Sequence, residues 1–211
     1  MICGVDEAGR GPVIGPLVVA GVMTDEAGVK RLIKLGVKDS KKHSPTQREE
    51  LYNIIISFTK HHSIHISPEE LDSLMISKSL NKIEAKVFAG VIDILSPALA
   101  YVDSADVSTE KFREMILLGL NSSIEIVAEH KADERYPVVS AASIIAKVER
   151  DRVIKELHKT HGNFGSGYPS DPKTIKFLKN CVSGGEGFPD CVRKRWKTAI
   201  RASNLKLEEF F

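Results

Sequence analysis

Short apolar runs interrupted by glycine and proline open the chain and recur along it. Residues 2–7 (ICGVDE) and 13–23 (VIGPLVVAGVM) are such runs, and they predict two strands joined as a hairpin. Residues 98–103 (ALAYVD) and 124–130 (IEIVAEH) predict two further strands, and the alternating HSIHI of residues 62–66 predicts another.

Helical patterns separate these strands. Ser44 and Ser67 are each followed by proline and, three residues on, by Gln or Glu, which is a capping-box pattern. Strands alternating with helices after an opening hairpin predict the α/β class, with a mixed sheet flanked by helices. We expect helices after Ser44 and after Ser67, over about residues 80–95, 110–120 and 137–159, from Asp171 to the glycines near Gly184, and, as a basic helix, over about 191–202.

The composition is that of a self-contained globular chain. With 211 residues, 42% of them hydrophobic, it is long enough to bury its own core. It has no run of about 18 apolar residues for a membrane span, and it begins with a strand pattern rather than a signal peptide. We therefore expect a soluble cytoplasmic monomer. Cys3, Cys181 and Cys191 fit neither a disulfide framework nor zinc-ligand spacing, so we interpret them as structural thiols.

Charge is distributed unevenly along the chain. The net charge is +2, but the stretch from Lys147 to Lys206 holds 14 Lys and Arg against 6 Asp and Glu, so the remainder is acidic. Such an asymmetry favours a basic surface for a polyanion beside an acidic region. A solvated helix face explains the same lysines, so the charge alone does not identify a nucleic acid as the partner.

Four carboxylates stand at the ends of predicted strands. Asp6 and Glu7 close the first strand, Asp103 ends another, and Asp133 lies just past a third. Carboxylates at strand ends can converge on one cleft, although unit charges about 4 Å apart repel by roughly 4 kcal/mol at an effective dielectric of 20. A divalent cation relieves this repulsion, and an all-oxygen ligand set suits Mg²⁺ or Mn²⁺. The alternative, that these acids only form turns, is strongest for Asp103.

The turn after the first acids is rich in glycine. Gly9, Gly11 and Gly15 resemble a dinucleotide-binding loop, but the third glycine is one residue late, and a second strand follows where that fold requires a helix. The pattern therefore excludes a Rossmann oxidoreductase. Glycines on both sides of Arg10 favour close approach of the backbone to a bulky ligand, with Arg10 reaching a phosphate.

Taken together, these motifs resemble the type 2 ribonucleases H, or ribonucleases HII, in their archaeal form, over nearly the whole chain. The similar stretches are GVDEAGRGPVIGPLVVAGV, VKDSKK, YVDSAD, HKADERYPVVSAASIIAKVERD and GSGYPSDP. The resemblance implies a ribonuclease H-like fold and an endonuclease that hydrolyses the RNA strand of RNA–DNA hybrids. It also implies cutting 5′ of ribonucleotides embedded in duplex DNA, with two Mg²⁺ or Mn²⁺ ions and products that carry a 3′-hydroxyl and a 5′-phosphate.

The same resemblance assigns roles to individual residues. Asp6, Glu7, Asp103 and Asp133 would be both the catalytic residues and the metal ligands. The backbone of Gly9, Arg10 and Gly11 would recognise the 2′-hydroxyl, and Tyr168 would lie against the sugar of the following deoxynucleotide.

Basic and small polar residues extend the predicted substrate-binding set. Ser140, Ser143, Lys147 and Arg150 fall on one helix face, which favours contact with a phosphate backbone. For the two serines a tight helix contact is an equal alternative, because Ala141, Ala142 and Ala146 permit close packing. Lys41 and Lys42 of the DSKK motif are interpreted as phosphate contacts rather than ordinary surface lysines. The basic helix is expected to bind the duplex through Arg193, Lys194, Arg195 and Lys197, with Trp196 as a core anchor.

The last residues form a separate motif. Residues 204–211 (NLKLEEFF) resemble the peptide that binds the DNA sliding clamp, with Leu207, Phe210 and Phe211 at its apolar positions and Asn204 where the pattern has Gln. The alternative is that both phenylalanines pack on the enzyme itself. We therefore expect a catalytic domain over residues 1–165, a basic helical extension over 166–203 and a clamp-binding tail over 204–211.

Two other functions are compatible with parts of this pattern. A non-catalytic hybrid-binding module would use the basic C-terminal third, and its acids would only cap strands. A DNA nuclease of the same superfamily would keep the acids but would not need the ribose-recognising GRG and Tyr168. Metal-dependent cleavage separates the first alternative from an enzyme, and the choice of substrate separates the second.

Overall fold

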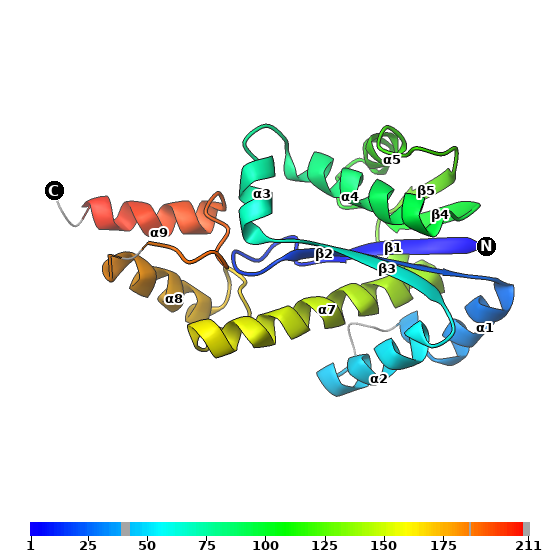
Figure 1. Ribbon diagram of the computed structural model, residues 1–211, viewed down its shortest axis with the longest axis horizontal. Helices are drawn as coiled ribbons and strands as arrows, with labels where there is room; N and C mark the ends of the chain where they lie inside the picture. Colours follow the sequence, from blue (N-terminus) through cyan, green and yellow to red (C-terminus); the bar gives the residue numbers. More distant parts are fainter. Residues whose placement is uncertain (39–42, 186, 209–211) are drawn as a thin grey trace. The chain divides into compact units, whose positions relative to one another are not determined.

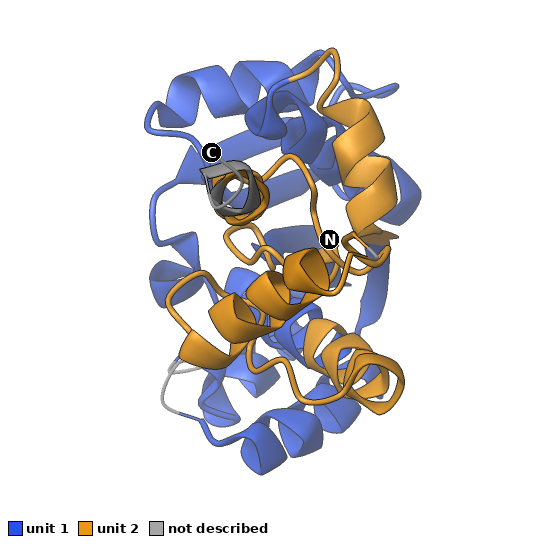
Figure 2. Cartoon of the chain, turned by 90° about the vertical axis from the view of Figure 1, so that its left-hand side faces the viewer, with its two compact units in different colours: residues 1–8, 18–64, 79–149 blue, residues 9–17, 65–78, 150–211 orange. Residues whose placement is uncertain are grey.

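The chain forms two compact units, each assembled from segments that are not adjacent in sequence (Figure 2). The computed structural model describes residues 1–38, 43–185 and 187–208, the last four of them as backbone only. Unit 1 comprises Met1–Ala8, Val18–Ile64 and Ser79–Glu149, and unit 2 comprises Gly9–Leu17, His65–Lys78 and Arg150–Phe211. The division expected near residue 165 stays a prediction.

A mixed sheet organises unit 1. In the described residues it contains β1 (Ile2–Ala8), β2 (Leu17–Thr24), β3 (Lys60–Ile66), β4 (Leu99–Asp103) and β5 (Glu125–Glu129), in the order β3-β2-β1-β4-β5. β1 pairs with β2 antiparallel, while β4 pairs parallel with both β1 and β5. The predicted α/β class, opening hairpin and mixed sheet are confirmed.

Helices cover both faces of this sheet (Figure 1). Every residue of β2 is buried, and its side chains alternate between two apolar clusters, as a strand inside a three-layer structure requires. Val18, Ala20 and Val22 face α1, α2 and the first half of α7, whereas Val19 and Met23 face α4 and α5. The helices are α1 (Glu26–Lys34), α2 (Pro45–Ile56), α4 (Leu80–Leu95), α5 (Thr109–Leu117), the short α6 (Ala132–Arg135) and α7 (Pro137–His161).

Unit 2 has its own apolar core. It contains α3 (Pro68–Leu74), α8 (Pro172–Ser183), α9 (Lys197–Glu208) and the second half of α7. Its buried side chains come from the loop after β1, from α7 and the loop that follows it, from α8 and α9, and from the segment before α9; they include Val13, Ile14, Ile154, Phe164, Leu178 and Val192. None of the described helices has the length and apolar character needed to cross a membrane.

Local capping explains where several helices begin. Ser44 and Ser67 each form the reciprocal capping box, in which the serine accepts from the third helical N–H and the Gln or Glu at that position accepts from the serine N–H. Asp171 accepts from the N–H of Lys173 at the start of α8, and Gly184 ends that helix. The helices predicted from these signals are confirmed.

One helix was not predicted, and the predicted start of another is wrong. α1 was not predicted, although Asp25 caps it through the N–H of Gly28, because its sequence is short and mostly polar. The basic helix expected from residue 191 begins only at Lys197. The residues before it form turns and one isolated bridge instead: the carbonyl of Cys191 accepts from the N–H of Gly15, and the N–H of Arg193 donates to the carbonyl of Val13, so long-range pairing replaces helix bonds.

Candidate active site

Three carboxylates meet at the carboxyl end of the sheet in unit 1. Val5 pairs with Val102, so Asp6 and Asp103 are the next residues along two parallel strands. Asp133 lies in α6, directly after β5. One oxygen from each of Asp6, Asp103 and Asp133 lies within 4.8 Å of the others. The structure thus brings together residues that are separated by more than a hundred positions in the sequence.

Asp103 also helps to fix the position of Asp133. Its Oδ1 accepts a hydrogen bond of 3.1 Å from the backbone N–H of Ala132, in the first turn of α6. Lys131, just before that turn, has a left-handed backbone with φ of 56°, so the chain bends sharply into the helix. Asp103 therefore shapes a turn, as the alternative interpretation held, and in doing so it sets the position of Asp133.

The electrostatics of this cluster are those of charges crowded away from water. Burial raises the pKa of Asp6 well above its ordinary value, and the charges of Glu7 and Asp103 raise it further. Hydrogen bonds from the Ser143 hydroxyl and the Glu7 N–H act in the opposite direction. An all-oxygen ligand set with this repulsion fits a hard divalent cation, whose positive charge would offset the repulsion between the carboxylates.

Glu7 differs from the other three acids. Neighbouring residues of a strand point to opposite faces, and Glu7 does not belong to the group of three carboxylates that could hold an ion. Its backbone N–H donates to Oδ1 of Asp6 at 2.7 Å, so it supports the cluster through its main chain. Its predicted role as a metal ligand stays a prediction.

Close packing of α7 on β1 holds the cluster in place. A Cβ on Gly4 would lie 2.2 Å from backbone atoms of Val138 and Val139, so only glycine lets the helix approach this far. Ser143 on this helix then reaches Asp6. This role of Gly4 could not be predicted, since a lone glycine in a strand carries no signal for a helix lying against it.

The predicted contact of Ser140 with a phosphate backbone is wrong. Its side chain is fully buried, and its hydroxyl donates to the carbonyl oxygens of Asp133 and Tyr136. It therefore joins α7 to the turn that carries Asp133 instead of facing a phosphate, and the helix-contact alternative holds. Ser143 and Lys147 are half-buried on the same helix, and their predicted substrate contacts stay predictions.

The glycine-rich loop that follows β1 belongs to unit 2. Gly9 has φ of 91°, and a Cβ there would lie 2.5 Å from the Pro16 carbonyl oxygen and 2.6 Å from Nε of Arg150. Glycine is thus required at this position for both backbone and space. Gly11 is exposed and lies beside the ring of Tyr168, since a Cβ placed on Gly11 would be 3.7 Å from Cε1 of that ring.

A tight turn presents Tyr168. Gly167 has φ of 79°, and its carbonyl accepts from the N–H of Val13 at 2.8 Å. Asp171 accepts from the N–H of Ser166 at 2.7 Å, and the buried Thr174 hydroxyl accepts from the N–H of Gly167 at 3.0 Å. The Tyr168 side chain itself is 38% exposed. The GSGYPSDP motif thus holds an accessible ring beside the glycine loop.

Two arginines lie under this loop, contrary to expectation. Arg150 is 2% exposed and donates to the carbonyl of Ile14 at 3.2 Å, so it does not line an open phosphate-binding face. Arg193 is fully buried, and its guanidinium donates to the carbonyls of Gly9, Arg10 and Gly15. Burial, followed by the nearby charge of Arg150, lowers the pKa of Arg193 to about 9. The prediction that Arg193 is a surface contact for a duplex is wrong, because loop carbonyls occupy its donors.

The remaining predicted contacts are exposed or lie outside the described residues. Lys194 is exposed and forms an ion pair of 3.8 Å with Asp190. Lys41 and Lys42, the side chain of Leu207, and both Phe210 and Phe211 lie outside the described residues. Trp196 packs against the core of unit 2, as predicted for a core anchor.

Fold and site together define a class of protein. A mixed sheet with parallel central strands, helices on both faces and clustered carboxylates at its carboxyl end is a ribonuclease H-like arrangement, and its acids suit divalent-metal chemistry on a phosphodiester. The class is therefore that of the metal-dependent nucleases with this fold.

Comparison with known proteins narrows the class to one family. The family model for ribonuclease HII matches residues 3–199. The ribonuclease HII of Pyrococcus furiosus is 48% identical over 221 aligned positions, which cover 100% of this chain and 98% of the relative. Two solved structures are similar: the ribonuclease HII of Archaeoglobus fulgidus, described in a complex with PCNA (50% identity, TM-score 0.89, 96% of both chains), and the ribonuclease H2 of Pyrococcus horikoshii (44% identity, TM-score 0.91, 97% of both chains).

This chain belongs to the ribonuclease HII family, and it is a metal-dependent ribonuclease.

Proposed function

We propose that the chain is an endonuclease that hydrolyses the RNA strand of RNA–DNA hybrids and cuts 5′ of ribonucleotides embedded in duplex DNA. The products would carry a 3′-hydroxyl and a 5′-phosphate, and the activity would serve ribonucleotide removal and RNA primer processing. The observation that carries the proposal is the cluster of Asp6, Asp103 and Asp133, whose oxygens lie within 4.8 Å of one another.

The acids have a defined task in this reaction. Two Mg²⁺ or Mn²⁺ ions held by these carboxylates would activate a water molecule and stabilise the leaving oxygen. Asp6 is central in the cluster, because it is buried, borders Asp103 on the neighbouring strand and receives hydrogen bonds that fix its orientation. Asp103, which accepts from the N–H of Ala132 at the start of α6, would hold Asp133 close to the other two acids. A preformed ligand set avoids reorganisation when substrate binds.

The loop and the turn of unit 2 are proposed to select the sugar. Backbone groups of Gly9, Arg10 and Gly11 would bind the 2′-hydroxyl, since glycine leaves the main chain open to a ligand. Tyr168 would pack on the next sugar, where a 2′-hydroxyl would be crowded. Two facts support this assignment: the Tyr168 ring is accessible, and it lies beside Gly11.

One experiment tests both the reaction and the substrate. The protein is incubated with three duplexes of one sequence: a duplex with a single ribonucleotide, an RNA–DNA hybrid and plain DNA. Each is tested with Mg²⁺, with Mn²⁺ and with EDTA. Metal-dependent cutting of the first two duplexes alone, with the expected end groups, is the predicted result. Cutting of plain DNA would favour a DNA nuclease, and binding without cutting would favour the non-catalytic module.

A partner is proposed for the C-terminal tail. The similar Archaeoglobus fulgidus enzyme is described in a complex with PCNA, and residues 204–211 of this chain resemble a clamp-binding peptide. Burying each terminal phenylalanine in a partner pocket would contribute roughly 1.5–3 kcal/mol. Calorimetric titration of the host's clamp with the full chain and with a chain ending at Ser203 tests this. Equal heats from both, or none from either, would refute it.

A further inference from the structure

Arg193, in the segment before α9, is hydrogen-bonded to the loop that follows β1. The guanidinium uses three separate nitrogens, with Nη2 donating to Gly9 O at 2.6 Å, Nε to Gly15 O at 2.9 Å and Nη1 to Arg10 O at 3.3 Å. Its backbone N–H donates to Val13 O at 2.8 Å. The residue therefore spans the loop from Gly9 to Gly15, and its side chain is shielded from solvent.

These bonds determine which way the peptide groups of the loop face. In a planar trans peptide, the C=O of one residue and the N–H of the next point in opposite directions. The described residues contain no cis peptide bond. With the carbonyls of Gly9 and Arg10 directed at the guanidinium, the N–H groups of Arg10 and Gly11 are directed away from it. Those are two donors of the GRG segment that would meet a ribose hydroxyl.

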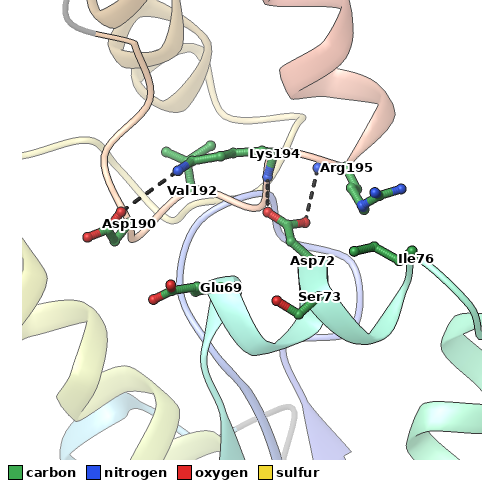
Figure 3. Close-up of a pocket in the computed structure, with 8 residues that line it drawn as sticks. All are labelled: Glu69, Asp72, Ser73, Ile76, Asp190, Val192, Lys194 and Arg195. Carbon is green, nitrogen blue, oxygen red and sulfur yellow. Dashed lines mark hydrogen bonds and ion pairs between the residues drawn. The ribbon is translucent and has the colours of Figure 1, made fainter.

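Further contacts involve Arg193 and the two residues that follow it. Asp72 on α3 accepts from the N–H of Lys194 at 2.6 Å through Oδ2 and from the N–H of Arg195 at 3.0 Å through Oδ1 (Figure 3). The Trp196 ring lies over the guanidinium at 4.6 Å from its centroid. Trp196 thus contacts the guanidinium directly, while Asp72 restrains the backbone immediately after Arg193. Nothing in the sequence distinguishes Asp72 from an ordinary helix acid.

We propose that Arg193 and Asp72 are positioning residues that set the selectivity for ribose, by aligning the N–H groups of Arg10 and Gly11. The inference rests on the proposed recognition of the 2′-hydroxyl by this loop. Arg193 does not touch the substrate, and it acts through the direction of two peptide groups. A planar fork is needed for this task, because a lysine ammonium cannot bond three separated carbonyls in the same geometry.

The test compares two dissociation constants for each variant. Proteins carrying Asp103→Asn to prevent cutting are titrated, in Mg²⁺, with a duplex that contains one ribonucleotide and with the same duplex in DNA alone. The readout is the ratio of the two constants. Arg193→Lys should reduce this ratio by roughly tenfold, which corresponds to about 1.4 kcal/mol for misdirected hydrogen bonds. Arg113→Lys, which changes a surface arginine of α5 that pairs with Glu110, is the matched control and should leave the ratio unchanged.

The ratio separates positioning from general damage. A variant that is only less stable has a smaller active fraction. This raises both apparent dissociation constants by the same factor and leaves their ratio unchanged. A normal ratio in folded Arg193→Lys would overturn the inference. Should that variant show no cooperative melting, Asp72→Ala decides: a folded protein with a reduced ratio supports the inference, and one with a normal ratio overturns it. If the original protein itself binds both duplexes equally, the proposed ribose recognition fails first.

Discussion

Replacing Asp6 by asparagine should make the metal-free protein more stable while it abolishes cleavage. Asparagine keeps the size of the side chain, and its carbonyl oxygen can still accept the hydrogen bond from the N–H of Glu7. What the change removes is one negative charge, at the buried Asp6, from a group of three carboxylates. We thus predict that the three carboxylates favour cation binding and that their mutual repulsion lowers the stability of the metal-free protein.

The magnitude follows from the geometry. Two unit charges 4.8 Å apart, the upper limit of the separations in this cluster, repel by about 3.5 kcal/mol at an effective dielectric of 20. The raised pKa of Asp6 means that its carboxyl retains a proton to higher pH, and this reduces the repulsion. A net gain of about 2 kcal/mol in the free energy of unfolding is therefore expected, which is roughly 4–8 °C in Tm for a chain of this size.

The pH dependence provides an internal check. A carboxyl with a raised pKa in the folded state binds its proton more tightly there than in the unfolded chain. Stability is thus lost as the pH rises from the ordinary value of 3.8 toward the raised pKa. The Tm difference between Asp6→Asn and the original protein should be near zero at about pH 4, where both folded proteins are uncharged at this position, and should grow toward neutral pH.

Thermal melts followed by circular dichroism, in EDTA and in Mn²⁺, measure both effects. Mn²⁺ at about 100 times its dissociation constant should stabilise the original protein by about 2.7 kcal/mol and the variant much less. Glu125→Gln, which removes an exposed charge of β5, is the control and should change neither property. A lower Tm for Asp6→Asn in EDTA, or equal stabilisation of both proteins by Mn²⁺, would refute the account of the cluster.

Three further outcomes are expected. Tyr168→Ala should impair cleavage at a single ribonucleotide more than cleavage of a long hybrid, in parallel kinetic assays; equal losses would mean that the ring only positions its turn. Gly9→Ala should cost roughly 1–3 kcal/mol of stability through backbone strain and reduce cleavage, which thermal melts and the same kinetic assay would show; an unchanged Tm would contradict the strain. Burial raises the pKa of Cys3 to about 12 and that of Cys191 to about 11, so a thiol reagent at about pH 8 should label only Cys181 in the folded protein and all three thiols after unfolding; rapid native labelling of Cys3 would show that the core opens.

Much of the fold was predictable because its signals are local. The serines before α2 and α3 bond to N–H groups within the same turn, and β4 ends at an aspartate that the sequence already marks as a strand end. The acids of the site could be proposed for the same reason, as carboxylates at the ends of apolar runs. The helix expected from residue 191 failed because Val13 and Gly15, nearly 180 residues away, bond to that segment.

The α/β class, the capped helices, the four acids and the resemblance to a ribonuclease family could all be inferred from the residues alone, since each depends on residues that are close in the chain or on a motif. Which polar residues face inward could not be inferred in this way, because it depends on how distant segments pack in the fold. Arginine and serine are residue types that commonly bind phosphate at a surface, yet Arg150, Arg193 and Ser140 are all buried. Each of these side chains donates hydrogen bonds to carbonyl oxygens, as buried polar groups generally do, and the fold gathers those carbonyls largely from distant segments.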